Sequence, residues 1–295
     1  MKIKFWGVRG SIPTPGANTV RYGGNTACIE VRGDSNEMII LDAGSGIKQL
    51  GESLLKESPV EIHLLISHTH WDHINGFPFF VPAYIPSNII HFYGPPHFNK
   101  SLREIIQGQM EYSYFPVRAD ELNAKIDYRD LKEETIKIGN ITIQSKLTNH
   151  PVTNYGYRLE EEGKVVVYTG DHEKYYNFVT NPGDTGEKEE IDRIVEEQNN
   201  RIIQFVKGAD ILIADSQYTE EEYASKIGWG HSTIYQSLDL AIKGGVKYLI
   251  LFHHEPVRTD KEQDSLLNLV RERYAQLGFS GMKITAAAEG EEIRI

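Results

Sequence analysis

The sequence predicts a layered α/β fold in which two β-sheets pack face to face and helices cover their outer sides. Short apolar runs, typical of strands, alternate with longer amphipathic stretches, typical of helices, and no segment is repeated along the chain. Each half of the chain is rich in such strands and ends in a helix. Two strand-rich halves of this kind suit two stacked sheets with external helices.

The individual elements are placed from these runs. Strands are expected where a short run is mainly apolar, at residues 2–6, 27–31, 38–41, 62–67, 89–93, 135–138, 141–146, 155–159, 164–168, 211–214, 248–252 and 283–286. Longer stretches with mixed polar and apolar positions predict helices at residues 47–53, 101–109, 187–206, 232–242 and 261–277.

Two segments interrupt this alternation. Residues 77–134 combine many aromatic residues with prolines, which indicates a rigid wall near a site, a buried dimer surface or local core packing. Residues 172–200 contain a turn cluster at 181–186 that leads into a charged helix. For this second segment we expect a solvated insertion, with a lid as the alternative.

The pattern His-Thr-His-Trp-Asp-His at residues 68–73 directly follows an apolar run at 62–66. Imidazole nitrogens and carboxylate oxygens are ligands of zinc and similar divalent ions, and a strand-to-loop turn can aim alternate side chains at one point. We therefore expect a metal site here. The alternative is a cluster of solvated loop histidines.

Three further strands end in a histidine or an aspartate. His150 follows the run at 141–149, Asp171 follows 165–170, and His253 follows 248–252. Open sheets gather their functional groups at the carboxyl ends of strands. Because one loop cannot complete the ligand shells of two ions, these residues are expected to join the cluster at 68–73.

The chain resembles the metallo-β-lactamase superfamily in residues 5–11, 41–44, 68–73, 150, 169–172 and 253. The resemblance implies an αββα four-layer sandwich, with residues 1–295 as a single domain that has insertions near 77–134 and 172–207. It also implies two divalent metal ions, with zinc as the first expectation and manganese or iron as alternatives. In that reading the first ion is held by His68, His70 and His150, the second by Asp72, His73 and His253, and Asp171 bridges the pair.

Gly-His-Ser-Thr at residues 230–233, followed by an amphipathic stretch at 234–242, resembles the phosphodiesterase branch of this superfamily. That branch includes the tRNA 3′-processing endonucleases and the phosphoribosyl cyclic phosphodiesterases. The resemblance implies that His231 protonates the leaving oxygen and that Asp215 orients His231. Asp72 is expected to orient the attacking hydroxide as well as to bind metal. The alternative for His231 is a cap of the helix that begins near Ser232.

These residues predict a binuclear metal-dependent hydrolase. A phosphodiesterase that acts on a small cyclic nucleotide or a related phosphodiester is expected, because two close ions activate a shared water and neutralise charge on phosphate oxygens. A glyoxalase-II-like or lactonase-like acyl hydrolase is one alternative, since it would share the metal ligands without needing residues 230–233. A non-catalytic metal-binding sensor domain is the other.

The composition indicates which kinds of partner the protein binds and in which compartment it works. A net charge of −11 without a run of Lys and Arg argues against extended binding of a long nucleic acid, so a small phosphodiester substrate is expected. No apolar run is long enough to span a bilayer, and residues 1–7 lack an apolar signal region. Cys28 is the only cysteine, which excludes a disulfide framework. A cytoplasmic protein without a membrane partner is expected, with a homodimer as one arrangement.

Several other residues are weaker candidates. The residues considered for substrate contact are Arg9, Asn25, Thr26, Tyr218, Trp229, His254 and Arg258. His63, His91 and His97 are expected to be ordinary structural or surface histidines, and no role is assigned to His172.

Overall fold

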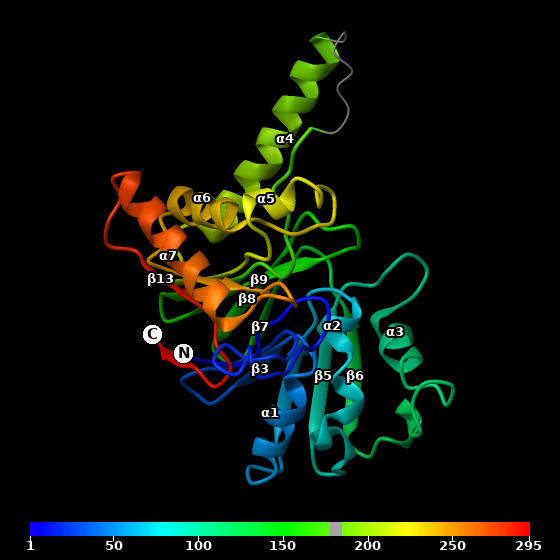
Figure 1. Cartoon of the computed structure of the whole chain (residues 1–295). Helices are drawn as coiled ribbons and strands as arrows, with labels where there is room; N and C mark the ends of the chain where they lie inside the picture. Colours follow the sequence, from blue (N-terminus) through cyan, green and yellow to red (C-terminus); the bar gives the residue numbers. More distant parts are fainter. Residues whose placement is uncertain (178–184) are drawn as a thin grey trace.

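Two mixed seven-stranded sheets pack face to face in the computed structural model, which describes residues 1–177 and 185–295 (Figure 1). In spatial order the first sheet contains β14 (Glu292–Arg294), β1 (Lys2–Gly7), β2 (Cys28–Arg32), β3 (Met38–Leu41), β4 (Glu61–Leu65), β5 (Ile89–Gly94) and β6 (Lys125–Asp130). The second sheet contains β13 (Lys283–Ala286), β12 (Tyr248–Phe252), β11 (Ile211–Asp215), β10 (Lys164–Tyr168), β9 (Tyr155–Glu161), β8 (Ile141–Leu147) and β7 (Thr135–Ile138). This arrangement confirms the predicted sandwich of two stacked sheets.

Helices cover the outer face of each sheet (Figure 1). On the side of the first sheet lie α1 (Ile47–Leu54) and α3 (Leu102–Gly108), and on the side of the second lie α6 (Ile234–Gly244) and α7 (Asp260–Gln276). The long helix α4 (Thr185–Val206) packs on this side through its C-terminal end and projects away from the sheets (Figure 1). Two single-turn helices, α2 (Trp71–Ile74) and α5 (Glu220–Tyr223), occupy connecting segments. No helix among the described residues is long and apolar enough to cross a membrane.

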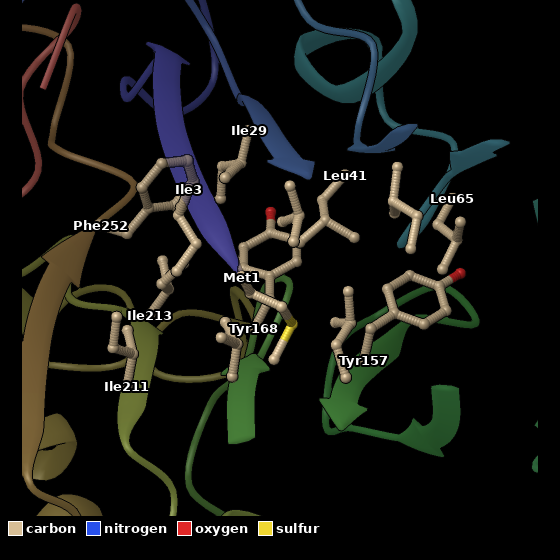
Figure 2. Close-up of a cluster of buried hydrophobic side chains, with 14 of the residues drawn as sticks. Met1, Ile3, Ile29, Leu41, Leu65, Tyr157, Tyr168, Ile211, Ile213 and Phe252 are labelled. Atoms are coloured by element: carbon tan, nitrogen blue, oxygen red, sulfur yellow. The ribbon is translucent and has the colours of Figure 1, made fainter. Parts of the chain in front are cut away.

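The strands β3, β11 and β12 are buried on both faces, which explains their continuous apolar runs. Alternate residues of β3 point to opposite sides: Ile39 and Leu41 pack between the sheets, whereas Ile40 packs under the helices of the first sheet. Figure 2 shows the layer between the sheets, where Leu41 and its neighbours face Tyr157 and Tyr168 of the second sheet. This apolar layer sets the distance between the two sheets. It therefore also sets the distance between the strand ends of the first sheet and those of the second.

All the predicted strands and helices are present, with ends within two residues of those expected. Two strands at the sheet edges, β6 and β14, were not predicted, because they read Lys-Ile-Asp-Tyr-Arg-Asp and Glu-Ile-Arg and offer few apolar residues. The short helices α2 and α5 were also missed.

The two segments that interrupt the sequence pattern have different structures. Residues 77–134 supply β5, α3 and β6, and Phe77 and Phe80 lie fully buried under the first sheet, so local core packing accounts for these two aromatic residues. In residues 172–207, α4 begins at Thr185, and positions 181–184 of the predicted turn cluster lie outside the described residues. A single domain over the whole chain stays a prediction.

A substitution of Gly44 tests how tightly the first sheet packs against the loop after β4. A Cβ at this position would overlap the carbonyl oxygen of Asp72 and the hydroxyl of Thr26. Gly44→Ala is therefore expected to lower the free energy of unfolding by about 1–3 kcal/mol, as overpacking typically does. Gly108→Ala is the matched control, because a Cβ there meets nothing within 4 Å. Because Gly108 is the last residue of α3, this change should stabilise by at most about 1 kcal/mol, the Gly-to-Ala difference of a helix interior. Equal effects of the two substitutions in denaturant unfolding would contradict the packing described here.

Candidate metal centre

The predicted metal ligands meet at one edge of the sandwich, between the two sheets. The loop after β4 carries residues 68–73, while His150, Asp171 and His253 follow β8, β10 and β12 of the second sheet. The expected ligands form two four-residue groups, one of His68, His70, His150 and Asp171, and one of Asp72, His73, Asp171 and His253, and a third group joins Asp171 and His253 to Asp215 and His231. The fold therefore brings together all seven side chains expected to bind metal, and Asp171 belongs to both groups.

The first group is arranged around one oxygen of Asp171. His68 Nε2 lies 3.4 Å and His150 Nε2 lies 3.9 Å from Asp171 Oδ2. His70 joins through Nδ1, which lies 3.1 Å from His150 Nε2. Ligands of a tetrahedral zinc ion at about 2.0 Å are separated by about 3.3 Å, so these spacings suit a shared ion.

The second group is arranged around the other oxygen of Asp171. His73 Nε2 and His253 Nε2 each lie 3.3 Å from Asp171 Oδ1 and 3.3 Å from each other. Asp72 Oδ2 lies 3.2 Å from His253 Nε2. Since its two oxygens face different histidine groups, the carboxylate of Asp171 has the geometry of a bridging ligand.

Two buried atoms show that this cluster suits bound cations. His68 Nε2 and Asp171 Oδ1 are buried and have no hydrogen-bond partner. A buried polar atom without a partner is costly, and each of these two atoms faces the space that a divalent ion would share. The donor set of imidazole and carboxylate groups matches zinc, with manganese and iron as ions of related preference.

The second nitrogen of three histidines is held by a specific partner. Nδ1 of His73 lies 2.8 Å from Asp42 Oδ2, Nδ1 of His150 lies 3.0 Å from the carbonyl oxygen of Gly230, and Nδ1 of His253 lies 3.1 Å from Gln217 Oε1. Such contacts fix the tautomer and leave Nε2 free to bind metal. Asp42 was not assigned a role from the sequence, although its position at the end of β3 is the same kind of signal as the other strand ends.

Burial sets the charge state of the first group. Burial lowers the pKa of His68 well below its usual value, lowers that of His70, and lowers that of His150 to about 3, against the opposing effect of Asp171. These imidazoles are therefore neutral, the form that binds metal. For Asp171, burial favours the neutral carboxyl, but the surrounding histidines hold its pKa well below the usual range.

His231 and Asp215 form a buried pair beside the metal ligands. His231 Nδ1 lies 2.8 Å from Asp215 Oδ2, and its ring stacks on that of His253 with centroids 4.8 Å apart. Burial lowers the pKa of His231, but the carboxylates of Asp215 and Asp171 outweigh it and raise this pKa to about 9. With its Nδ1 proton held by Asp215, the imidazolium carries a second, transferable proton on Nε2.

The residue that caps α6 is Thr233, whose hydroxyl accepts the backbone N–H of Gln236. His231 is therefore not needed as a helix cap, and that alternative is wrong. The loop before α6 is instead tied to Glu173, a buried residue that the sequence did not single out. Glu173 accepts the N–H groups of Gly228 and Gly230 at 2.9 Å each.

The weaker candidates separate into buried and exposed residues. Arg9 is fully buried and donates to the carbonyl oxygens of Gly23, Glu255 and Arg258, so it holds loops together. The other candidates that are buried or hydrogen-bonded within the fold are Asn25, Thr26, His254 and Arg258. Tyr218 packs edge-on against His231, and Trp229 is exposed beside Gly230. Buried His172 lies outside the metal groups and accepts the N–H of Asn149.

Residues 37–254 match the protein family described as the β-lactamase superfamily domain. Because the match covers well over half of the chain, the protein belongs to this family. Together with the metal-ligating groups, this membership identifies the chain as a metal-dependent hydrolase of the metallo-β-lactamase fold.

Individual relatives agree with this membership. A ribonuclease Z from Brevibacillus brevis is 23% identical over 256 residues, which cover 76% of this chain and 78% of that protein. The metallo-β-lactamase fold protein YhfI from Bacillus subtilis matches with a TM-score of 0.67 at 19% identity and covers 99% of both chains. A diphosphatase of the PhnP family matches with a TM-score of 0.63 at 16% identity over 100% of this chain and 97% of the other. At these identities the solved structures show the shared fold.

Asp42 provides a test of how far the metal centre depends on residues behind the ligands. Its carboxylate also accepts the N–H of Ser67 at 2.6 Å and the hydroxyl of Tyr168 at 2.7 Å, so an amide could not satisfy all these donors. Asp42→Asn is expected to weaken zinc binding by roughly 10–100-fold, measured by competition with a chelator. Asp239→Asn is the control, because Asp239 forms an exposed pair with Lys243 within α6 and does not belong to the metal-ligating groups of the described residues. Unchanged zinc affinity in Asp42→Asn would show that His73 does not need this partner.

Proposed function

We propose that this chain is a binuclear phosphodiesterase that acts on a small substrate, such as a cyclic nucleotide or a related phosphodiester. The observation that carries the proposal is the buried Asp215–His231 pair beside Asp171. A phosphodiester that is hydrolysed releases an alkoxide, which needs a proton to depart. A protonated imidazole at the edge of a metal centre supplies that proton.

In this proposal two divalent ions, with zinc as the first candidate, are held by His68, His70, Asp72, His73, His150, Asp171 and His253. When bound, such ions supply a water of lowered pKa and neutralise charge on the phosphate oxygens.

The chain's own residues divide the remaining work. His231 donates a proton from Nε2 to the leaving oxygen, and Asp215 holds the ring by its Nδ1 proton. Asp215 is itself fixed by the backbone N–H groups of His172 and Gln217. Asp72 accepts the N–H of Ser11 at 2.6 Å, which holds its carboxylate beside the second metal group, where it would also orient the attacking hydroxide.

The size of the substrate follows from charge. The ribonuclease Z relatives carry a name that points to RNA, but this chain has a net charge of −11. Binding along many phosphates requires many Lys and Arg contacts, so we propose a small phosphodiester and not a long nucleic acid. A single phosphodiester group needs only the local positive charge of the metal centre.

The two alternative functions, an acyl hydrolase and a sensor domain, would use fewer of the residues at this site. An acyl hydrolase of the glyoxalase-II or lactonase kind would use the same metal ligands. A thioester releases a thiolate, which is much less basic than an alkoxide, so a glyoxalase-II reaction would have little need of the Asp215–His231 pair. A non-catalytic sensor domain would bind the metal ions, but it would have no reaction in which the Asp215–His231 pair takes part.

The proposal also includes the cellular compartment and the oligomeric state of the protein. A cytoplasmic location agrees with a single buried thiol, Cys28. For a homodimer, the exposed aromatic side chains of Phe79, Tyr112 and Tyr114 offer a contact surface.

Turnover of different substrate classes tests the proposal directly. The metal-loaded chain should hydrolyse cyclic nucleotides, cyclic phosphoribose or bis(p-nitrophenyl) phosphate much faster than lactones, thioesters or β-lactams, because two close metal ions can neutralise the charge on the phosphate oxygens, which an acyl group lacks. A precursor tRNA should be included in the same assay. Faster turnover of the acyl substrates would reject phosphodiesterase chemistry, and preference for the tRNA would reject the small substrate.

The role of His231 can be separated from metal binding by the choice of leaving group. His231→Ala should keep its metal content but lose roughly 100- to 10,000-fold in turnover of substrates with an alkoxide leaving group. Nitrophenolate is a stable anion that needs little proton assistance, so bis(p-nitrophenyl) phosphate should be affected much less. Asp215→Asn should show the same pattern more weakly.

His97→Ala is the control for this experiment, since His97 lies outside the metal-ligating groups. If His231→Ala slows both kinds of substrate equally, or removes metal, then His231 is a ligand or a structural residue.

A further inference from the structure

A separate group of metal-ligating side chains lies on the first sheet, away from the centre described above. Glu61 and His63 are alternate residues of β4, and His63, His91 and Asp127 form one row across β4, β5 and β6. His63 precedes His68 by five residues, which corresponds to about 16 Å of extended chain. The group therefore lies toward the opposite end of β4 from the hydrolytic centre.

Three ligand atoms of this group lie close together. The rings of His63 and His91 stack with centroids 4.8 Å apart and planes 14° apart. Glu61 Oε1 lies 3.0 Å from His91 Nε2 and 4.0 Å from His63 Nε2, and the three ligand atoms all lie within 4.8 Å of one another. A small rotation of the side chains brings them to the spacing of about 3.3 Å found around zinc.

The other nitrogen of each ring has its own partner. His91 Nδ1 lies 2.8 Å from a carboxylate oxygen of Asp127, and His63 Nδ1 lies 3.3 Å from the hydroxyl oxygen of Tyr93. Metal-binding histidines use their second nitrogen in this way, which leaves Nε2 directed at the ion. A simple surface ion pair would account for His91 between two carboxylates. It would not account for a second imidazole whose Nε2 is turned toward the same Glu61 oxygen.

The group is accessible to ions from solvent. The side chains of His63 and His91 are 16% and 20% exposed, and that of Glu61 is 60% exposed. Glu61, His63 and Tyr93 line part of a surface hollow of about 500 Å³. This space leaves room for the water molecules that complete the shell of an ion held by three protein ligands.

We propose that Glu61, His63 and His91 form an additional site for a divalent transition ion of the zinc, nickel or copper class, oriented by Asp127 and Tyr93. Imidazole and carboxylate ligands select this class of ion. The proposal concerns ion binding alone and does not depend on which substrate the hydrolytic centre accepts.

Zinc stoichiometry tests this site. The untagged chain and its variants are dialysed to equilibrium against micromolar free zinc, and bound zinc is measured by elemental analysis. His63→Ala, His91→Ala and Glu61→Gln should each bind one zinc fewer than the parent chain, while His97→Ala should match the parent. Asp127→Asn should keep the site but weaken it by roughly 10–100-fold, because only the orientation of His91 is lost.

Two controls keep the outcome clear. Glu61→Gln changes an exposed side chain, so its loss of one ion cannot be attributed to unfolding. Phosphodiester hydrolysis by all these variants should equal that of the parent, which separates this site from the hydrolytic centre. Equal zinc content in the parent, His63→Ala, His91→Ala and Glu61→Gln would overturn the proposal.

Discussion

The carboxylate of Asp171 is the interaction on which the arrangement of the site depends. One of its oxygens faces His68, and the other faces His73 and His253. His68 and His73 come from the first sheet, whereas Asp171 and His253 come from the second. A buried charge is stable only when opposite charges or ions surround it, and the loss of one partner of a buried pair typically costs about 3–5 kcal/mol. The two sheets must therefore hold their strand ends at one fixed separation, which the apolar layer of Figure 2 provides.

Backbone conformation at the strand ends serves the same centre. Asp42 and His253 adopt φ values of 63° and 61°, in the left-handed region that non-glycine residues usually avoid. Each such residue costs on the order of 1–3 kcal/mol, and such strain is typical of functional sites. Asp42 offsets this cost with its hydrogen bonds to Ser67, His73 and Tyr168. At His253, a Cβ on Gly10 would overlap the imidazole ring, so the neighbouring loop can approach only as glycine.

The sequence predicts which side chains come together at the metal centre, because the segments that carry them follow apolar strands whose ends converge at one edge of the sandwich. It also predicts the two packed sheets, since strands that are buried on both faces are apolar throughout. Edge strands such as β6 are missed because one face is charged. Asp42 follows an apolar strand as the other strand-end residues do, but the sequence does not show that its partner is His73, 31 residues further along the chain. Glu173 is missed because a single acidic residue among 42 carries no local signal of its partners. The partners of Glu173, Gly228 and Gly230, lie 55 and 57 residues further along the chain.

Glu173 supports both proposed functions of the site, metal binding and proton donation. Its carboxylate accepts the N–H of Gly230, and the carbonyl oxygen of the same Gly230 faces His150 Nδ1. A Cβ on Gly230 would overlap the ring of His150, so glycine permits this close contact. The next residue, His231, carries the proton proposed for the leaving group. One peptide segment thus positions a metal ligand and a proton donor together, and an error in this loop would disturb both. A hydrolase whose leaving group departs without a proton would need only the first of these two functions, so their coupling favours substrates with a basic alkoxide leaving group.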